Sequence, residues 1–83
     1  MKFTVTWIPS AESRLTELWL GSRVSARITA ATDRLDALLA ERPLEIGESR
    51  PAGLRIAFEV PLAIIYWVDS PARKVVVLDV WLF

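Results

Sequence analysis

The stretches LAIIYWV at residues 62–68 and KVVVLDVWL at residues 74–82 decide the fold of this chain. Both are rich in the β-branched and aromatic residues that favour strands. Ser70-Pro71-Ala72-Arg73 lies between them and suits a turn with proline at its second position. We therefore predict two antiparallel strands joined by a short turn. Because they are apolar at nearly every position instead of alternating, we expect both faces of this part of the sheet to be covered.

Two further strands are predicted upstream, at residues 54–59 and 2–8. In the N-terminal strand Phe3, Val5 and Trp7 point to one side and the threonines to the other, so this strand buries one face. Pro9 ends it. Residues 43–53 are rich in turn-forming residues and are expected to form a loop.

Two amphipathic helices are predicted between the first strand and this loop. Ser10 is placed to cap the first helix, and Gly21 to end it in a left-handed conformation. Ser22 is placed to cap the second helix, which should end at Arg42 because Pro43 disfavours helical geometry at the residue before it. The apolar positions recur at helical spacing. They are Leu15, Leu18 and Trp19 in the first helix and Val24, Ile28, Ala31, Leu35, Leu38 and Leu39 in the second.

This order predicts an α+β fold with a single domain at residues 1–83. It consists of an N-terminal strand, a two-helix hairpin and a C-terminal antiparallel strand meander, with the helices packed on one face of a small twisted sheet. The last two strands should be central or nearly so. The predicted core includes Trp19, Leu35, Leu38, Ile64 and Val77. A chain this short is not expected to cover the second sheet face itself, so a partner or a second copy should do so.

The composition excludes several classes of function. Ten Lys and Arg balance ten Asp and Glu, so the chain lacks the general basic excess of a nucleic-acid binder. Without cysteine or histidine it has no thiolate metal site, no disulfide and no Ser-His-Asp triad, and we expect no cofactor and no metal. The N-terminus does not resemble a secretion signal and no apolar run is long enough for a membrane helix. We expect a cytoplasmic protein without membrane contact.

Two parts of the sequence carry a recognisable pattern. The first is VTWIPSAE at residues 5–12, with Leu15 and Leu18-Trp19 after it, and the second is LAIIYWVD at residues 62–69 followed by VVVLDV at residues 75–80. They resemble the opening strand with its polar-Pro-x-Ala-Glu helix start and the paired final strands of the RelE/ParE superfamily, the plasmid-stabilisation type toxins of type II toxin-antitoxin systems. The resemblance spans essentially the full chain.

Two mechanisms are implied by this resemblance. The ribonuclease branch cuts messenger RNA on the ribosome without metal, using basic residues of the central strands and a polar C-terminal tail. Here Ala63 stands where that branch often has an arginine, and the sequence ends at Phe83 without such a tail. The remaining candidates for phosphate or target contacts are Arg50, Arg55, Arg73 and Lys74, and those for proton transfer are Glu59 and Tyr66. For each of them a structural role is the alternative. The gyrase-inhibiting branch does not use that catalytic set, so we predict a toxin that acts by binding its target.

The partner implied is a cognate antitoxin, and Trp67 and Trp81 are the predicted anchors for it, because tryptophan is enriched among the residues that dominate interfaces. The alternative is that these rings belong to the core. DNA gyrase or the ribosome is the implied target, and DNA would be bound only through the antitoxin. A non-toxic module that binds an antitoxin or forms a homodimer is the further alternative.

Overall fold

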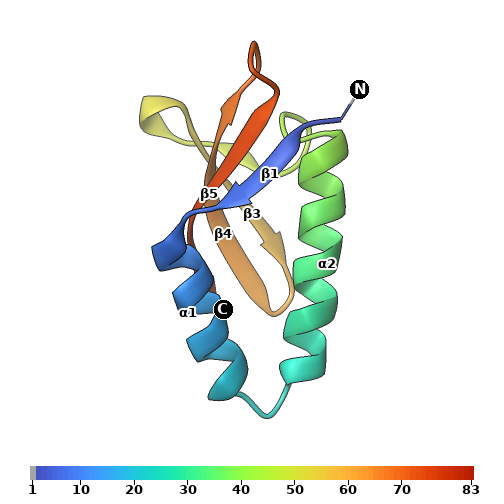
Figure 1. Cartoon of the computed structure of the whole chain (residues 1–83), viewed down its shortest axis with the longest axis vertical. Helices are drawn as coiled ribbons and strands as arrows, with labels where there is room; N and C mark the ends of the chain where they lie inside the picture. The colour runs from blue at the N-terminus through green and yellow to red at the C-terminus, as the bar shows by residue number, and fades with distance from the viewer. Residues whose placement is uncertain (1) are drawn as a thin grey trace.

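The computed structural model describes residues 2–83, which form a mixed sheet and two α-helices (Figure 1). In chain order the elements are β1 (Thr4–Trp7), α1 (Pro9–Leu20), α2 (Ser25–Glu41), β2 (Glu48–Ser49), β3 (Leu54–Glu59), β4 (Leu62–Asp69) and β5 (Lys74–Leu82). A short 3-10 turn, Pro51–Gly53, precedes β3. The α+β architecture predicted from the sequence is confirmed.

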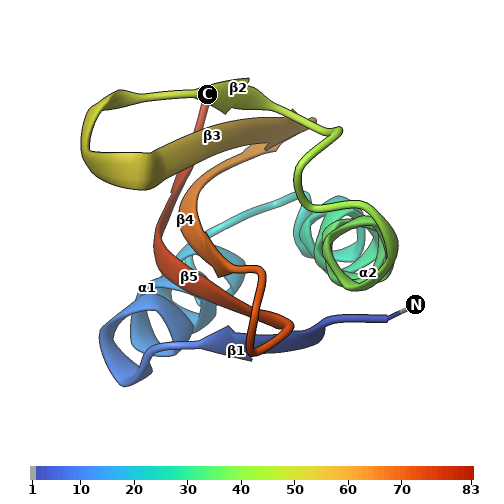
Figure 2. The ribbon, with the colours of Figure 1, turned by 90° about the horizontal axis from the view of Figure 1, so that it is seen from above.

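The strand order in the sheet is β1-β5-β4-β3-β2. The pairs β2–β3, β3–β4 and β4–β5 are antiparallel, whereas β1 runs parallel to β5. This confirms that β4 is central and β5 lies beside it. Strand β2 is a two-residue edge strand inside the segment expected to be a loop. Figure 2 shows how the twisted sheet curves from β1 to β2 around α2.

Both helices pack on the same face of the sheet. Ile28, Ala31, Leu35 and Leu39 of α2 belong to one buried cluster with the inward residues of β4 and β5, and Leu15 and Leu18 of α1 pack against that cluster. The sheet residues of the cluster include Leu62, Ile64, Tyr66, Val75, Val77 and Val80. The prediction that Leu35, Ile64 and Val77 are core residues is therefore confirmed.

Two of the predicted core residues lie nearer the surface. Leu38 is only partly buried, because Leu35 and Leu39 take the inward positions of α2. Trp19 is 44% exposed, and its placement in the core was wrong. Its indole Nε1 donates a hydrogen bond to the hydroxyl of Thr29 across the gap between the helices, at 3.0 Å. An indole has an apolar ring and a polar N–H, and it is therefore stable with one side packed and the other in water.

The predicted helix ends also differ from the observed ones. Helix α1 begins at Pro9, so Ser10 lies inside the first turn and Ile8 is the N-cap. Gly21 does end α1, but with φ of −86° instead of a left-handed conformation. Helix α2 begins at Ser25, because the Oγ of Ser22 accepts a hydrogen bond from the backbone N–H of Val24 and forms a local turn instead of a cap.

Within residues 2–83 no helix combines the length and the apolar character that crossing a membrane requires. The same residues contain no group of three or more acidic side chains arranged to hold a metal ion.

Candidate interaction surface

The strand register divides the sheet residues between two faces. Side chains alternate along a strand, and directly paired residues share a face. Tyr66, which belongs to the buried cluster under the helices, pairs with Arg55 and Val77. Its neighbour Trp67 therefore lies on the opposite face, together with its partners Leu54 and Val76.

Four aromatic residues lie on this opposite face, and we call them the aromatic face: Phe58, Trp67, Trp81 and Phe83. Ala63 pairs with Phe58 on one side and Trp81 on the other, and the ring of Phe83 meets that of Phe58 edge to face with centroids 5.0 Å apart. Phe58, Trp67 and Phe83 are 49%, 41% and 60% exposed. Neither helix of residues 2–83 packs over these rings, so the second sheet face is open and largely apolar, as the composition indicated, with the exposed Asp79 of β5 also on it.

The two tryptophans predicted as antitoxin anchors thus share one accessible face. Phe58 and Phe83 were not among the predicted anchors. A signal for Phe58 was present in the sequence, because Leu54, Ile56 and Phe58 alternate with Arg55, Ala57 and Glu59. That period of two indicates a strand with two different faces.

Ala63 lies between Phe58 and Trp81 on this face and is completely buried. The resemblance to ribonuclease toxins places an arginine at this position. Here the cross-strand neighbours are aromatic rings, which offer apolar contact instead of a positive charge for phosphate. The aromatic face is therefore suited to binding an apolar partner.

Arg55 and Tyr66 lie on the other side of the sheet and hold a loop in place. The guanidinium of Arg55 donates to the carbonyl oxygen of Ile46 and to the Oγ of Ser49, both at 2.9 Å. The hydroxyl of Tyr66 donates to the carbonyl oxygens of Pro43 and Ile46, at 2.8 and 3.1 Å. The candidate phosphate ligand Arg55 and the candidate proton-transfer group Tyr66 therefore connect residues 43–49 to β3 and β4.

The buried position of Tyr66 also affects its titration. Burial raises the pKa of its hydroxyl above the usual 10.0, and the neighbouring Arg55 opposes that rise through its hydrogen bond and charge. A tyrosine with a raised pKa keeps its proton at neutral pH. This favours hydrogen bonding over proton abstraction as the role of the side chain.

The other polar candidates are distributed over the molecule. Glu59 is largely covered and forms an ion pair with Arg34 of α2. Arg50 is exposed near β2, with a hydrogen bond to the carbonyl oxygen of Ser49 and a distance of 3.8 Å to the carboxylate of Glu48. Arg73 lies in the β4–β5 turn beside β1, across the sheet from β2, with its guanidinium 5.7 Å from the centre of the Phe3 ring.

Lys74 begins β5 beside Arg73 and is exposed. Glu59 and Arg55 point to the same side of β3 but lie at its two ends, and Arg73 and Lys74 lie on the β1 side of β4, across the sheet from β3. The fold therefore does not bring the six predicted polar residues together into one site.

No protein-family model matches this chain, and no curated protein matches its sequence. Solved structures do resemble it. A chain of the toxin-antitoxin complex RelBE2 from Mycobacterium tuberculosis superposes with a TM-score of 0.81 at 24% identity, covering 100% of this chain and 93% of that chain.

Two further structures agree with this match. A chain of the chromosomal ParDE toxin-antitoxin system from P. aeruginosa gives a TM-score of 0.73 at 14% identity, over 98% of this chain and 96% of that one. The isolated RelE toxin of E. coli gives 0.68 at 17% identity, over 96% of this chain and 83% of that one. The element order, the sheet topology and these superpositions agree: the chain has the fold of the RelE/ParE toxins.

Proposed function

We propose that this chain is the toxin component of a type II toxin-antitoxin system, acts by binding a cellular target, and is neutralised by a cognate antitoxin that docks on the aromatic face. The observation that carries the proposal is the match over nearly the whole length of the chain to structures of RelBE2, ParDE and RelE. The same proposal places the toxin in the cytoplasm, with DNA gyrase or the ribosome as its target.

The aromatic face supports docking of a protein partner. Exposed aromatic clusters of this kind are uncommon on monomers and tend to mark interaction sites. Tryptophan in particular is enriched among residues whose truncation costs at least about 2 kcal/mol in an interface. Trp67 and Trp81 lie on the same face, so a single antitoxin segment, lying along the sheet, could contact both.

Binding is favoured over RNA cleavage because the groups required for cleavage have other roles in this fold. Cleavage by a 2′-hydroxyl needs a base, an acid and cations for the developing phosphorane charge. Tyr66 and Arg55 anchor a loop, Glu59 pairs with Arg34, and Ala63 lies among aromatic rings. Arg73 and Lys74 lie together at one turn, without a carboxylate or hydroxyl of the predicted set beside them.

Inducible expression in a bacterial host tests the proposal. We expect growth arrest by the wild-type chain and recovery when the neighbouring gene is expressed with it. The double variant Trp67→Ala, Trp81→Ala should bind the product of that gene at least tenfold more weakly. Leu20→Ala, which removes an apolar side chain that is 71% exposed on α1, is the matched control and should bind normally.

Two results would contradict the proposal in different ways. Normal growth while folded protein accumulates would exclude a toxin and favour the non-toxic module. Codon-phased cleavage in an in vitro translation assay followed by primer extension would replace target binding by the ribonuclease mechanism.

A further inference from the structure

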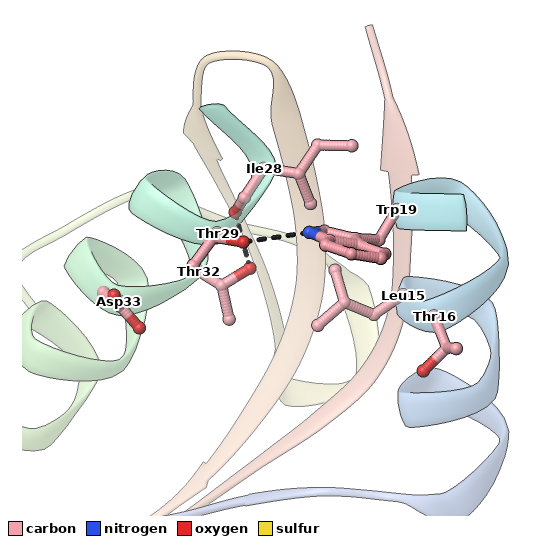
Figure 3. A pocket seen from close by; sticks show the side chains of 7 residues that line it. All are labelled: Leu15, Thr16, Trp19, Ile28, Thr29, Thr32 and Asp33. Carbon is pink, nitrogen blue, oxygen red and sulfur yellow. Dashed lines mark hydrogen bonds between the residues drawn. The ribbon is translucent and has the colours of Figure 1, made fainter. Parts of the chain in front are cut away.

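A hollow lies between the two helices (Figure 3). Both helices pack on the sheet face opposite the aromatic face. It measures about 230 Å³, and its apolar lining comes from Leu15 and Trp19 of α1 and Ile28 of α2. The indole of Trp19 extends from α1 toward α2, where the hydrogen bond to Thr29 holds it in place (Figure 3). Trp19 and Thr29 are both exposed, so the hollow opens to solvent.

A second hollow continues the first toward β1. It measures about 320 Å³ and shares Leu15, Thr16 and Thr32 with the first. Its remaining lining comes from Trp7, Glu12 and Asp36. Because the same residues of α1 and α2 line both hollows, the two form one continuous depression, which we call the interhelical groove. The groove has an apolar floor and extends along both helices.

The charged residues that line the interhelical groove are all acidic: Glu12, Asp33 and Asp36. No lysine or arginine of residues 2–83 lines it. None of the three carboxylates takes part in an ion pair with another described residue. Asp36 accepts a hydrogen bond from the Nε1 of Trp7 through one oxygen, at 2.9 Å, which leaves its second oxygen for another donor.

The nearest cation in sequence is directed elsewhere. Arg34 follows Asp33 on α2, but its side chain pairs with Glu59 of β3 and does not enter the groove. The chain as a whole has no net charge, so this acidic rim is a local excess. An excess of one sign around an apolar floor selects partners of the opposite sign.

We infer that the interhelical groove binds an amphipathic helical segment of a partner protein that presents aliphatic side chains flanked by lysine or arginine. The aliphatic side chains would occupy the floor formed by Leu15, Trp19 and Ile28, which is the helix-in-groove mode of recognition. The basic side chains would pair with Glu12, Asp33 and Asp36. A second copy of this chain fits less well, because a two-fold contact through the groove would place the acidic rims against each other.

This inference goes beyond the proposed function, because it concerns a different surface and assigns the partner by its chemistry. A synthetic peptide of about 15 residues tests it, long enough to be helical when rich in alanine. The peptide carries two leucines four positions apart with lysines on both sides. Binding of the labelled peptide to the full chain is followed by fluorescence anisotropy at low and at physiological ionic strength.

We expect binding that weakens as salt is added, because the carboxylates are near the surface. A peptide with both leucines replaced by alanine, and another with glutamate in place of lysine, should each bind at least tenfold more weakly. The double variant Glu12→Gln, Asp33→Asn should lose at least tenfold in affinity for the lysine peptide. Thr16→Phe, which places a ring in the groove, should do the same.

The matched control is the double variant Glu17→Gln, Glu41→Gln, which makes the same charge change on the same two helices but outside the groove. It should alter the affinity for the lysine peptide less than about twofold, since surface charges contribute little individually. All these side chains are exposed, and circular dichroism verifies that each variant folds.

The inference is overturned if the lysine peptide fails to bind at about 1 mM, which corresponds to only about −4 kcal/mol. An equal loss of affinity in the control and groove variants would also overturn it, because the net charge of the chain would then explain the binding without the groove. A dimer of the chain that Thr16→Phe dissociates would assign the groove to a second copy instead. Because the assay uses purified protein and a synthetic peptide, its outcome does not depend on whether the chain is toxic.

Discussion

Substituting Arg55 by methionine tests whether this arginine is a structural clamp or a free cation for a target. Methionine retains much of the aliphatic stem and removes the guanidinium. The bond to the carbonyl oxygen of Ile46, at 2.9 Å and partly buried, is the main loss. A hydrogen bond to a charged donor contributes about 1.5 to 3 kcal/mol when it is not fully solvated.

The other contacts of Arg55 add little. The bond to the Oγ of Ser49 is exposed, and the contacts of 3.4 Å to Tyr66 and 3.5 Å to Gly47 are too long to add much. The hydroxyl of Tyr66 has a single hydrogen for the carbonyls of Pro43 and Ile46, so it does not fully replace the arginine. We expect Arg55→Met to lower the free energy of unfolding by about 2 to 3 kcal/mol.

Arg50→Met is the matched control. Arg50 is exposed, bonds only the backbone of its neighbour, and lies 3.8 Å from a glutamate whose side chain is 68% exposed. Its loss should cost less than about 0.5 kcal/mol. Urea unfolding followed by tryptophan fluorescence measures both variants through the midpoint and the slope. If Arg55→Met costs no more than Arg50→Met, Arg55 is not a clamp and becomes available for contact with a target.

Three further predictions concern the core, the titration of the single tyrosine and the aromatic face. In urea unfolding, Leu35→Ala should lower the free energy of unfolding by about 2 to 5 kcal/mol, and Leu38→Ala, at a partly buried position, by about 1 to 2 kcal/mol. Equal losses would contradict the assignment of Leu35 to the inward face of α2. The free energy of unfolding should fall as pH rises above about 10, because burial raises the pKa of Tyr66 and the unfolded chain ionises first. Tyr66→Phe should reduce this decline, and an unchanged decline would assign it to other groups. The purified chain should self-associate in sedimentation experiments. The double variant Trp67→Ala, Trp81→Ala should associate less, with little change in the urea midpoint. Loss of the fold in this variant would instead place these rings in the core.

The helices, the strands and their order could be read from the sequence because they depend on local patterns. Pro9 separates β1 from α1 and Pro43 follows the end of α2, because proline cannot continue a strand ladder or a helix. The apolar positions of residues 25–41 recur at helical spacing. The alternation of apolar residues in residues 2–8 predicted a strand without any knowledge of its partner. The helix ends were less certain, since Ser10 and Ser22 are good caps in principle but neither serves as one.

The roles of the candidate site residues depend on contacts between distant parts of the chain. Arg55 was recognisable as a cation, but its use as a clamp depends on residues 46–49 folding back over β3. Trp19 has the helical spacing of a core residue, and only the separation of α1 and α2 leaves its ring half exposed beside a groove. Side chains from different elements meet only after the chain folds, so no local pattern predicted the interhelical groove.

The sequence by itself determined the α+β class, the strand pair at the C-terminus and the excess of apolar residues that leaves one sheet face open. The tertiary structure alone decided that β1 runs parallel to β5, that Trp67 and Trp81 share the open face, and that the acidic side chains of two helices line one groove. The physical reason is that secondary structure follows from propensities and periodicities within a few residues, whereas strand register and helix packing depend on how the whole chain buries its apolar surface.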